Sequence, residues 1–483
     1  MYILAIDQGT TGTTIAIYNR NGIRVKKTYR TFTQIYPKPG WVEHDPEEIW
    51  QTVVEGCAEI INNFNGKIAA VAITNQRETT LLWDKKTGKP VYHAIVWQCR
   101  RTAQICSELK SHENAIRQRT GLPLDPYFSG TKLKWLLENI SGYRQEKLLF
   151  GTIDTWLIWK LTGGKIHATD HTNASRTLLF NIHNLAWDSD LLELLTIPAH
   201  ILPEIKNPAD NFGLVSTIPG LAGIPIYAVA GDQQAALFGH QCFYPGEVKN
   251  TYGTGCFLVM NTGQEPVVSH NGLLTTIAIN ESCIPCYALE GSIFIAGAVI
   301  QWLRDEVQMI TSAAESESAA TAVTDNGGVY LVPAFVGLGA PHWDADARGT
   351  IVGLTRGANR NHIVRAALES MAYQSADVLA IMERESGLQI SGLKVDGGAT
   401  ANNFLMQFQA DILGIPVIRP EMAEITSLGV AFLAGIQAGI WRNSSEIKQL
   451  KQSGTAFNPA MVKTDRDKLL AAWHRAVRQT KTR

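Results

Sequence analysis

The sequence has no excess of charge of either sign and no apolar run long enough to cross a membrane. Its 43 basic residues stand against 44 acidic residues, a formal net charge of -1, so it lacks the basic surface that attracts nucleic acids or anionic membranes. No stretch reaches the roughly 18 uncharged apolar residues that a membrane span requires. The apolar residues 1–6 run directly into Asp7 without a basic leader, which indicates a strand and not a signal peptide. We therefore expect small-molecule partners, no nucleic acid and no integral membrane segment.

The cysteines give little support to disulfide pairing. All seven are scattered along the chain and their number is odd, unlike a disulfide framework. Cys283 and Cys286 form a lone CxxC without a second pair, so we assign it no zinc or redox function. The expected location is a reducing cytoplasm.

The common nucleotide-binding signatures are also missing. Gly66-Lys67, Gly88-Lys89 and Gly164-Lys165 lack both the upstream glycine and the following Ser or Thr of GxxxxGK[ST]. No GxGxxG follows a predicted strand, and the HRD and DFG motifs of protein kinases are absent. A nucleotide enzyme with this sequence must use another phosphate cradle.

The chain begins with two predicted strands joined by a Gly/Thr turn, and a second unit of the same kind occurs near the middle of the sequence. A chain of 483 residues is too long for one hydrophobic core and favours two domains. The two units are Tyr2 to Ile6, Gln8 to Gly12 and Thr13 to Tyr18, and then Val248 to Tyr252, Gly253 to Gly255 and Cys256 to Met260. This weak duplication predicts an α/β fold with a boundary near residues 239–246, giving domains 1–241 and 242–483.

Other segments show clear apolar periodicity or residues that typically begin or end a helix. Residues 46–61 have a helical pattern, and residues 69–73 read as a short buried strand. Asn361 is expected to cap a long helix that ends at Gly387, and a further helix is expected from about Asn402.

Two carboxylates, Asp7 and Asp232, each follow a buried-looking strand. The ends of strands in α/β sheets face ligand crevices, and magnesium usually takes one or two carboxylates besides phosphate oxygens. Glycine in the neighbouring turns lets backbone N–H groups approach phosphate. These turns and carboxylates together favour a magnesium–nucleotide site over plain structural hairpins.

Several motifs, in order and over nearly the whole chain, resemble those of the FGGY carbohydrate-kinase family, and in particular its glycerol-phosphorylating branch. The segments around Arg77 and Trp97 are the most specific to that branch. The matching motifs are residues 7–11 (DQGTT), 75–79 (NQRET), 97–101 (WQCRR), 125–132 (DPYFSGTK), 231–234 (GDQQ), 252–256 (YGTGC), 301–305 (QWLRD), 337–341 (GLGAP) and 396–399 (DGGA).

The resemblance implies two actin-like, ribonuclease-H-like domains with an active site in the cleft between them. It implies ATP-dependent phosphorylation of glycerol to glycerol 3-phosphate, with ATP and Mg²⁺ bound and with a homo-oligomer, a dimer or tetramer, as the assembly. By motif match, the residues that bind or enclose glycerol would be Arg77, Glu78, Trp97, Tyr127, Asp232, Gln233 and Phe257.

The same resemblance implies the remaining roles. Asp7 and Asp232 would hold the magnesium water shell, and Asp232 would also be the catalytic base. Nucleotide contacts would come from Thr10, Thr11, Gly12, Thr14, Thr254, Gly297, Gln301, Gly398 and Asn402.

The chain departs from the family pattern at two places. Thr14 stands where many glycerol-phosphorylating members have arginine, which puts one phosphate contact in doubt. Residues 216–225 carry no basic residue, although some bacterial members bind fructose 1,6-bisphosphate through an arginine in a loop there. We therefore expect no such inhibition.

Alternative interpretations stay open at this point. Arg77 and Glu78 can form an ordinary surface ion pair, and Trp97, Tyr127 and Phe257 can be ordinary core aromatics. Other members of the family phosphorylate xylulose, gluconate or erythritol. Actin-like folds also serve as ATPase chaperones, a different class of function on the same fold.

Overall fold

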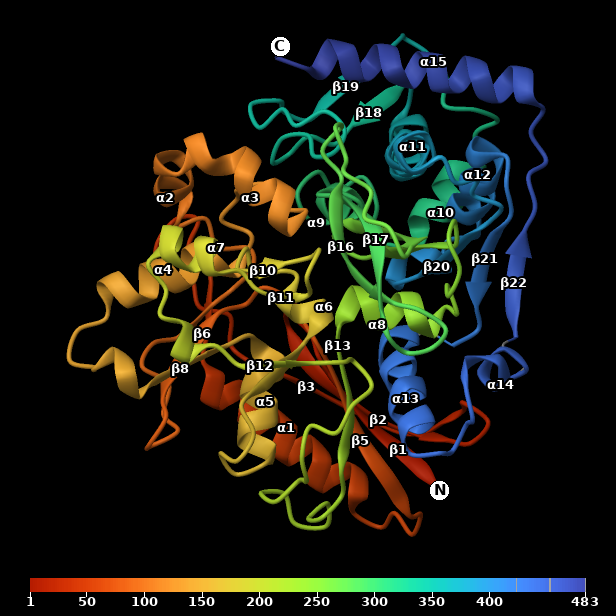
Figure 1. The fold of residues 1–483 in the computed structure, drawn as a ribbon. Helices are drawn as coiled ribbons and strands as arrows, with labels where there is room; N and C mark the ends of the chain where they lie inside the picture. The colour runs from red at the N-terminus through yellow and green to blue at the C-terminus, as the bar shows by residue number, and fades with distance from the viewer. Residues whose placement is uncertain (423, 451–452, 483) are drawn as a thin grey trace.

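The first sheet has five strands in the order β13-β5-β1-β2-β3 (Figure 1). The computed structural model describes residues 1–422, 424–450 and 453–482. In this sheet β1, β2 and β3 form an antiparallel meander, while β5 and β13 run parallel to β1. The strands are β1 (Tyr2–Gln8), β2 (Gly12–Asn19), β3 (Arg24–Thr31), β5 (Ile68–Asn75) and β13 (Ile226–Gly231). The predicted opening meander is confirmed.

Helix α1 (Pro46–Ile61) covers one face of this sheet and matches the predicted helix. The side chain of Asp45 accepts a hydrogen bond from the backbone N–H of Glu47, and proline occupies the first turn, where its missing N–H costs nothing. Helix α1 and helix α5 (Ile153–Leu161) bury apolar side chains against β1, β2 and β5. This packing fixes the sheet whose strand ends carry Asp7 and Asp232.

The second sheet repeats the topology of the first. Its order is β16-β17-β15-β14-β20-β21-β22, and β17-β15-β14-β20-β21 reproduces the order and directions of β3-β2-β1-β5-β13. The strands are β14 (Val248–Tyr252), β15 (Cys256–Gly263), β16 (Leu274–Ile279), β17 (Pro285–Ile293), β20 (Leu393–Asp396), β21 (Val417–Pro420) and β22 (Gly454–Phe457). The predicted α/β fold with duplicated actin-like units is confirmed.

Two helices of the second half differ in how well the sequence predicts their starts. Helix α11 (Arg360–Ser386) begins one residue before Asn361, so the prediction that Asn361 is the cap was wrong. The cap is Asn359, whose side chain accepts from the backbone N–H groups of Asn361 and His362, while His362 reaches back to the N–H of Asn359. Asn402 does cap the next helix, α12 (Asn403–Leu413).

Two short helices connect the sheets. Helix α8 (Asp232–Gly239) follows β13, and helix α13 (Ile425–Gln437) follows β21 but packs on the first sheet, where Leu428 and Phe432 join Ala5 and Ala72 in one cluster. Figure 1 shows α13, in blue, beside the red strands. The two helices cross so closely that a Cβ on Gly429 would collide with a carbonyl oxygen of α8. The chain thus returns to the first sheet near its end, and the boundary at residues 241 and 242 stays a prediction.

Smaller elements surround this frame. Helices α2 (Ala103–Glu108), α3 (Glu113–Thr120), α4 (Ser129–Asn139), α6 (His171–Ala174) and α7 (Ser189–Leu195) extend the first half, and α9 (Gly297–Asp305), α10 (Glu315–Thr321), α14 (Ser444–Lys448) and α15 (Lys463–Thr480) the second. Short strand pairs are β4 (Glu43–His44) with β7 (Ala94–Ile95), β6 (Leu81–Asp84) with β8 (Leu148–Gly151), β9 (Ala168–Asp170) with β12 (Glu204–Lys206), β10 (Phe180–Asn181) with β11 (Ala186–Trp187), and β18 (Tyr330–Val332) with β19 (Thr350–Val352). Within the described ranges, no helix combines the length and apolar character needed to span a bilayer.

Candidate active site

The ends of β1 and β13 bring two carboxylates together. Asp7 is the second-last residue of β1, and Asp232 directly follows β13. Burial raises the pKa of Asp7 to about 7, and the nearby charge of Asp232 adds to that rise. The two side chains, which are 225 positions apart in the sequence, therefore share one electrostatic environment, as the sequence predicted.

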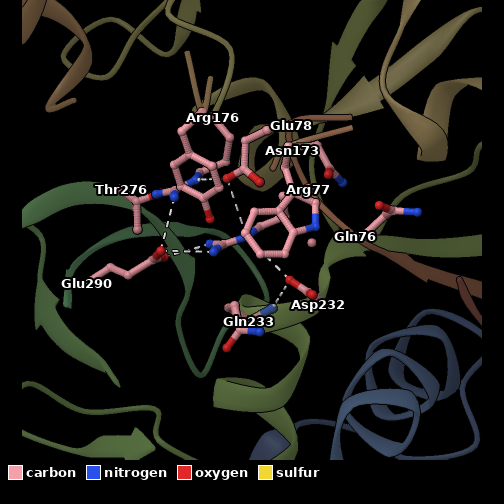
Figure 2. Close-up of polar contacts among 12 residues, drawn as sticks. Gln76, Arg77, Glu78, Asn173, Arg176, Asp232, Gln233, Thr276 and Glu290 are labelled. Atoms are coloured by element: carbon pink, nitrogen blue, oxygen red, sulfur yellow. Dashed lines mark hydrogen bonds and ion pairs between the residues drawn. The ribbon is translucent and has the colours of Figure 1, made fainter. Parts of the chain in front are cut away.

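Arg77 connects this edge to the second sheet. Its Nη1 and Nη2 donate to the carboxylate of Glu290 on β17 at 2.6 and 2.9 Å, and its Nε lies 3.3 Å from an oxygen of Asp232. Figure 2 shows the guanidinium between these two carboxylates. The Arg77 and Glu78 side chains are each 2% exposed, which rejects the surface-pair interpretation.

Arg176 and Glu290 complete this charged network, and sequence reasoning missed both. Arg176, in the turn after α6, donates from Nε to Glu78 at 2.6 Å and from Nη2 to Glu290 at 3.0 Å. Burial alone would raise the pKa of Glu290, but Arg176 and Arg77 lower it to about 2. Glu290 therefore stays ionised and holds two arginines of the first half. Nothing local marks either residue, because their partners lie 98 to 213 positions away.

Glu78 has an unusual backbone conformation, with φ of 62°. Such left-handed geometry is uncommon for a non-glycine residue and persists only where surrounding contacts hold it. The backbone carbonyl of Glu78 accepts hydrogen bonds from the hydroxyls of Thr80 and Ser129, at 2.8 and 3.0 Å. Together with the Arg176 bond, these contacts fix the direction in which the Glu78 carboxylate points.

Three aromatic side chains stand beside the charged network. Trp97 makes edge-to-face contacts with Tyr127 and Phe257, with ring centroids 5.6 and 6.4 Å apart. All three are only partly buried, so they are not simply core aromatics. The indole N–H of Trp97 donates to the hydroxyl of Thr10 at 3.0 Å, which ties this apolar wall to the first Gly/Thr turn.

Gln233 is held in a defined orientation. Its backbone N–H donates to Asp232 at 2.7 Å, and its side-chain carbonyl accepts from the ammonium of the buried Lys249. Lys249 also donates to the hydroxyl of Thr251 at 2.8 Å. Burial lowers the pKa of Lys249 to about 8, against the opposing effect of Asp396 and Asp232. With its carbonyl engaged, the Gln233 amide presents N–H groups as donors to a ligand.

The second Gly/Thr turn joins β14 to β15 and packs on the start of α9. Gly297 donates from its backbone N–H to the carbonyl of Gly253 at 3.0 Å, and Ala298 donates to the carbonyl of Thr254 at 3.1 Å. A Cβ on Gly297 would stand 2.6 Å from the Gly253 carbonyl oxygen, so glycine is required there. The Thr254 side chain is exposed at this turn.

The other residues predicted to contact the nucleotide divide between the two halves. In the first half, Thr11 is exposed, Thr14 pairs with Asp7 across β1 and β2, and Gly12 is buried under the ring of Tyr29. In the second half, the exposed Gln301 lies on α9, Gly398 has open space where a Cβ would stand, and Asn402 caps α12. The first set lies in the first Gly/Thr turn and the start of β2, whereas the second set is spread over three elements.

Known proteins resemble this chain over almost its whole length. The model of the FGGY family of carbohydrate kinases, N-terminal domain, matches residues 2–239, and that of the C-terminal domain matches residues 248–438. "Glycerol kinase 1" of Clostridium tetani is 57% identical, with 99% of this chain and 98% of that protein covered. "Glycerol kinase" of Carboxydothermus hydrogenoformans is 58% identical, with 99% and 97% covered.

Solved structures agree with this assignment. A crystal structure of Plasmodium falciparum glycerol kinase with ADP is 39% identical, has a TM-score of 0.94 and covers 100% of this chain and 98% of that one. Gluconate kinase from Lactobacillus acidophilus has a TM-score of 0.88 over 99% of this chain and 96% of that one, but is only 24% identical, so it supports the fold alone. On these grounds the chain belongs to the FGGY family of carbohydrate kinases.

Proposed function

We propose that the chain transfers the γ-phosphoryl group of ATP to a terminal hydroxyl of glycerol, giving sn-glycerol 3-phosphate and ADP. The observation that carries the proposal is the buried network of Arg77, Glu78 and Asp232 beside the wall formed by Trp97, Tyr127 and Phe257. Support also comes from relatives named glycerol kinase at 57 and 58% identity. The product would feed glycerol catabolism and the supply of lipid precursors.

The proposed substrate fits the chemistry of these side chains. Each hydroxyl of a polyol is both a donor and an acceptor, and the site offers carboxylates as acceptors together with guanidinium and amide groups as donors. Arg77, Glu78, Tyr127, Asp232 and Gln233 would bind the hydroxyls. Trp97 and Phe257 would contact the carbon chain. An analogue that lacks a hydroxyl would leave a buried polar group unpaired, which penalises its binding.

Asp232 is the proposed catalytic base. As the terminal hydroxyl oxygen bonds to the γ-phosphorus, Asp232 accepts its proton, and the bond from that phosphorus to the β,γ-bridging oxygen breaks with its electron pair leaving on ADP. Burial raises the pKa of Asp232 above its ordinary value, while Arg77 and Lys249 oppose that rise. The side chain stays 30% exposed, which leaves it accessible to a substrate.

Magnesium would be held by Asp7 and Asp232 through its water shell. The donor set fits, because Mg²⁺ takes oxygen ligands and keeps several waters when only one or two carboxylates and substrate phosphates bind it. Burial raises the pKa of Asp7 to about 7, and repulsion from Asp232 adds to that rise. A cation between the two carboxylates would relieve this repulsion. When bound, the ion would neutralise charge on the phosphate oxygens.

The two Gly/Thr turns would hold the phosphates of ATP. Backbone N–H groups and hydroxyls of Thr10, Thr11 and Thr254 are suited to phosphate oxygens. The remaining proposed nucleotide contacts are Gly12, Thr14, Gly297, Gln301, Gly398 and Asn402. Closure of the two domains, 1–241 and 242–483, over both substrates would exclude water and limit ATP hydrolysis. We also propose a cytoplasmic location and a homo-oligomer.

A coupled assay of ADP release tests the proposal. Glycerol, xylulose, gluconate and erythritol are offered in turn with Mg²⁺ and ATP, and the product is identified by mass spectrometry and ³¹P NMR. We expect glycerol to give the highest kcat/KM and glycerol 3-phosphate as product. A higher kcat/KM for another polyol would assign a different substrate within the family. ATP hydrolysis that glycerol does not stimulate would instead favour an actin-like ATPase.

A further inference from the structure

Arg176 has one guanidinium nitrogen without a hydrogen-bond partner. The side chain is fully buried, its Nε donates to Glu78 and its Nη2 to Glu290, but its Nη1 has no partner among the described residues. Buried donors in native proteins nearly always have a partner, and an exception calls for a specific explanation such as a ligand. Leaving a charged donor unpaired costs the free energy of removing it from water.

The unpaired nitrogen belongs to a guanidinium that lies beside residues of the proposed polyol site. The Arg176 guanidinium carbon is 5.7 Å from the centroid of the Tyr127 ring and 5.4 Å from that of Phe128. Figure 2 shows Arg176 beside Glu78, with Arg77 and Glu290 on the neighbouring side. Each of these partners is itself buried. The unpaired donor therefore lies in a buried region next to the Glu78 and Glu290 carboxylates.

The position of Arg176 is fixed from both ends of its side chain. Asp170 caps helix α6 by accepting from the backbone N–H groups of Thr172 and Asn173, at 2.7 and 3.1 Å. The backbone N–H of Arg176 then donates to the carbonyl of Asn173 at 3.0 Å. At the other end, Glu78 and Glu290 hold two of the three nitrogens. The third nitrogen is thus prepositioned, with little freedom to find another partner by changing its rotamer.

We infer that Arg176 is a further substrate-binding residue, whose Nη1 donates a hydrogen bond to one of the two polyol hydroxyls that are not phosphorylated. The same hydroxyl donates a hydrogen bond to the adjacent Glu78 carboxylate, because a hydroxyl can accept and donate at once. This inference rests on the proposed function. It makes Arg176 a determinant of specificity for polyols that carry a hydroxyl at that carbon.

The test compares Arg176→Lys with the wild type on glycerol, propane-1,2-diol and propane-1,3-diol, measuring kcat/KM for each. Lysine keeps the positive charge but loses the planar fork. We expect a loss of about 10- to 100-fold on glycerol, the range of one charged hydrogen bond in a buried site. On the diol that lacks the contacted hydroxyl, the loss should be at least about fivefold smaller. An equal loss on all three substrates would overturn the inference.

Arg101→Lys is the matched control. Arg101 is another arginine whose side chain is unexposed. It pairs with Glu43 at 2.6 Å and packs on Trp41, outside the charged network. Its replacement should change thermal stability without changing the ratio of kcat/KM between glycerol and either diol. A selective loss on glycerol in this variant as well would show that the pattern does not report a contact of Arg176, and would also overturn the inference.

A wild-type measurement covers the case in which Arg176→Lys does not fold. In a crystal structure with glycerol bound, a hydroxyl oxygen should lie within about 3.2 Å of Arg176 Nη1, whereas water or no oxygen at that nitrogen rejects the inference. Wild-type turnover separates the two hypotheses. If the wild type does not phosphorylate glycerol, the proposed function fails; if it does and Arg176 makes no contact, only this inference fails.

Discussion

The two halves of the molecule share one topology and carry different chemistry at the same places. In the first half, the strand ends present Asp7, Arg77 and Asp232. Arg77 pairs with Asp232 and Glu290, whereas Asp7 is a buried carboxylate near Asp232. In the second half, the matching ends present Gly253 to Gly255 and Gly397 and Gly398, which have little or no side chain. The turn after β1 and the turn after β14 each close with one backbone hydrogen bond, of 2.9 and 2.8 Å.

This difference matches the two proposed substrates. A small neutral polyol offers only hydroxyls, so its recognition needs fixed charged side chains that are expensive to leave unpaired. A nucleotide brings its own charge and size, and backbone N–H groups on glycine-rich turns can approach it closely. Duplication thus supplies one frame twice. In the proposed assignment, the charged strand ends of the first half serve the polyol, and both Gly/Thr turns serve the phosphates of the nucleotide. Glu290, in the second half, accepts hydrogen bonds from Arg77 and Arg176 of the first half.

The largest expected effect comes from the carboxylate edge of the first half. Asp232→Asn should lower kcat by about 10²- to 10⁴-fold, the usual contribution of a positioned base, while glycerol binding measured by calorimetry stays detectable. The amide keeps the shape of the side chain but cannot accept the proton. Unchanged turnover would exclude Asp232 as the base and would remove the main chemical distinction between the halves.

A slightly smaller effect is expected where the halves meet. Glu290→Gln removes one partner of a buried ionic network, which typically costs about 3–5 kcal/mol of stability. Because the pKa of Glu290 is lowered from 4.5 to about 2, its stabilisation is fully present above pH 4.5 and is lost as the pH falls towards 2.

The measurement is chemical denaturation of the wild type and the Gln variant at several pH values. The gap in unfolding free energy between them should be constant above pH 4.5 and narrow below it. Glu247→Gln is the control, since Glu247 is partly exposed and lies 3.9 Å from Lys394. A gap that does not change with pH would mean that Glu290 is not ionised by its arginines.

A moderate effect is expected at the glycine-rich edge of the second half. Gly297→Ala pushes a methyl group towards the Gly253 carbonyl and should raise the KM for ATP about tenfold, a change of about 1.4 kcal/mol, with little change in the KM for glycerol. Gly398→Ala is the matched variant, because its Cβ meets no described atom within 4 Å. A raised KM for ATP in Gly398→Ala would therefore report direct contact with the nucleotide. An equal rise in the KM for glycerol would contradict the division between the halves.

The smallest expected effect tests the link between the polyol wall and the phosphate turn. Trp97→Phe keeps an aromatic ring but removes the indole N–H that donates to Thr10. One neutral hydrogen bond contributes about 0.5–1.5 kcal/mol, so kcat/KM for glycerol should fall by about 2- to 13-fold. Steady-state kinetics with both substrates varied will measure this. No change in kcat/KM would mean that the wall and the turn act independently.

The local sequence was sufficient to predict most of the helices and strands discussed above and to identify the motif residues. The meander of β1 to β3, helix α1 and the start of α12 near Asn402 follow from periodicity and turn residues over a few positions. The cap of α11 was misplaced by two residues because Asn359 and Asn361 are both good capping residues. Only the reciprocal bond from His362 distinguishes them in the fold.

The sequence by itself determined the two strand-turn-strand units, the placement of Asp7 and Asp232 at the ends of buried strands, and the family to which the chain belongs. Each depends on residues that are close in the chain. Tertiary structure alone decided that Arg176 and Glu290 join Arg77, and that α13 returns to cover the first sheet. A buried charge is costly unless an opposite charge pairs with it, and that partner can come from any part of the fold. The partners of Arg77 and Arg176 are distant in the sequence, so no local periodicity can identify them.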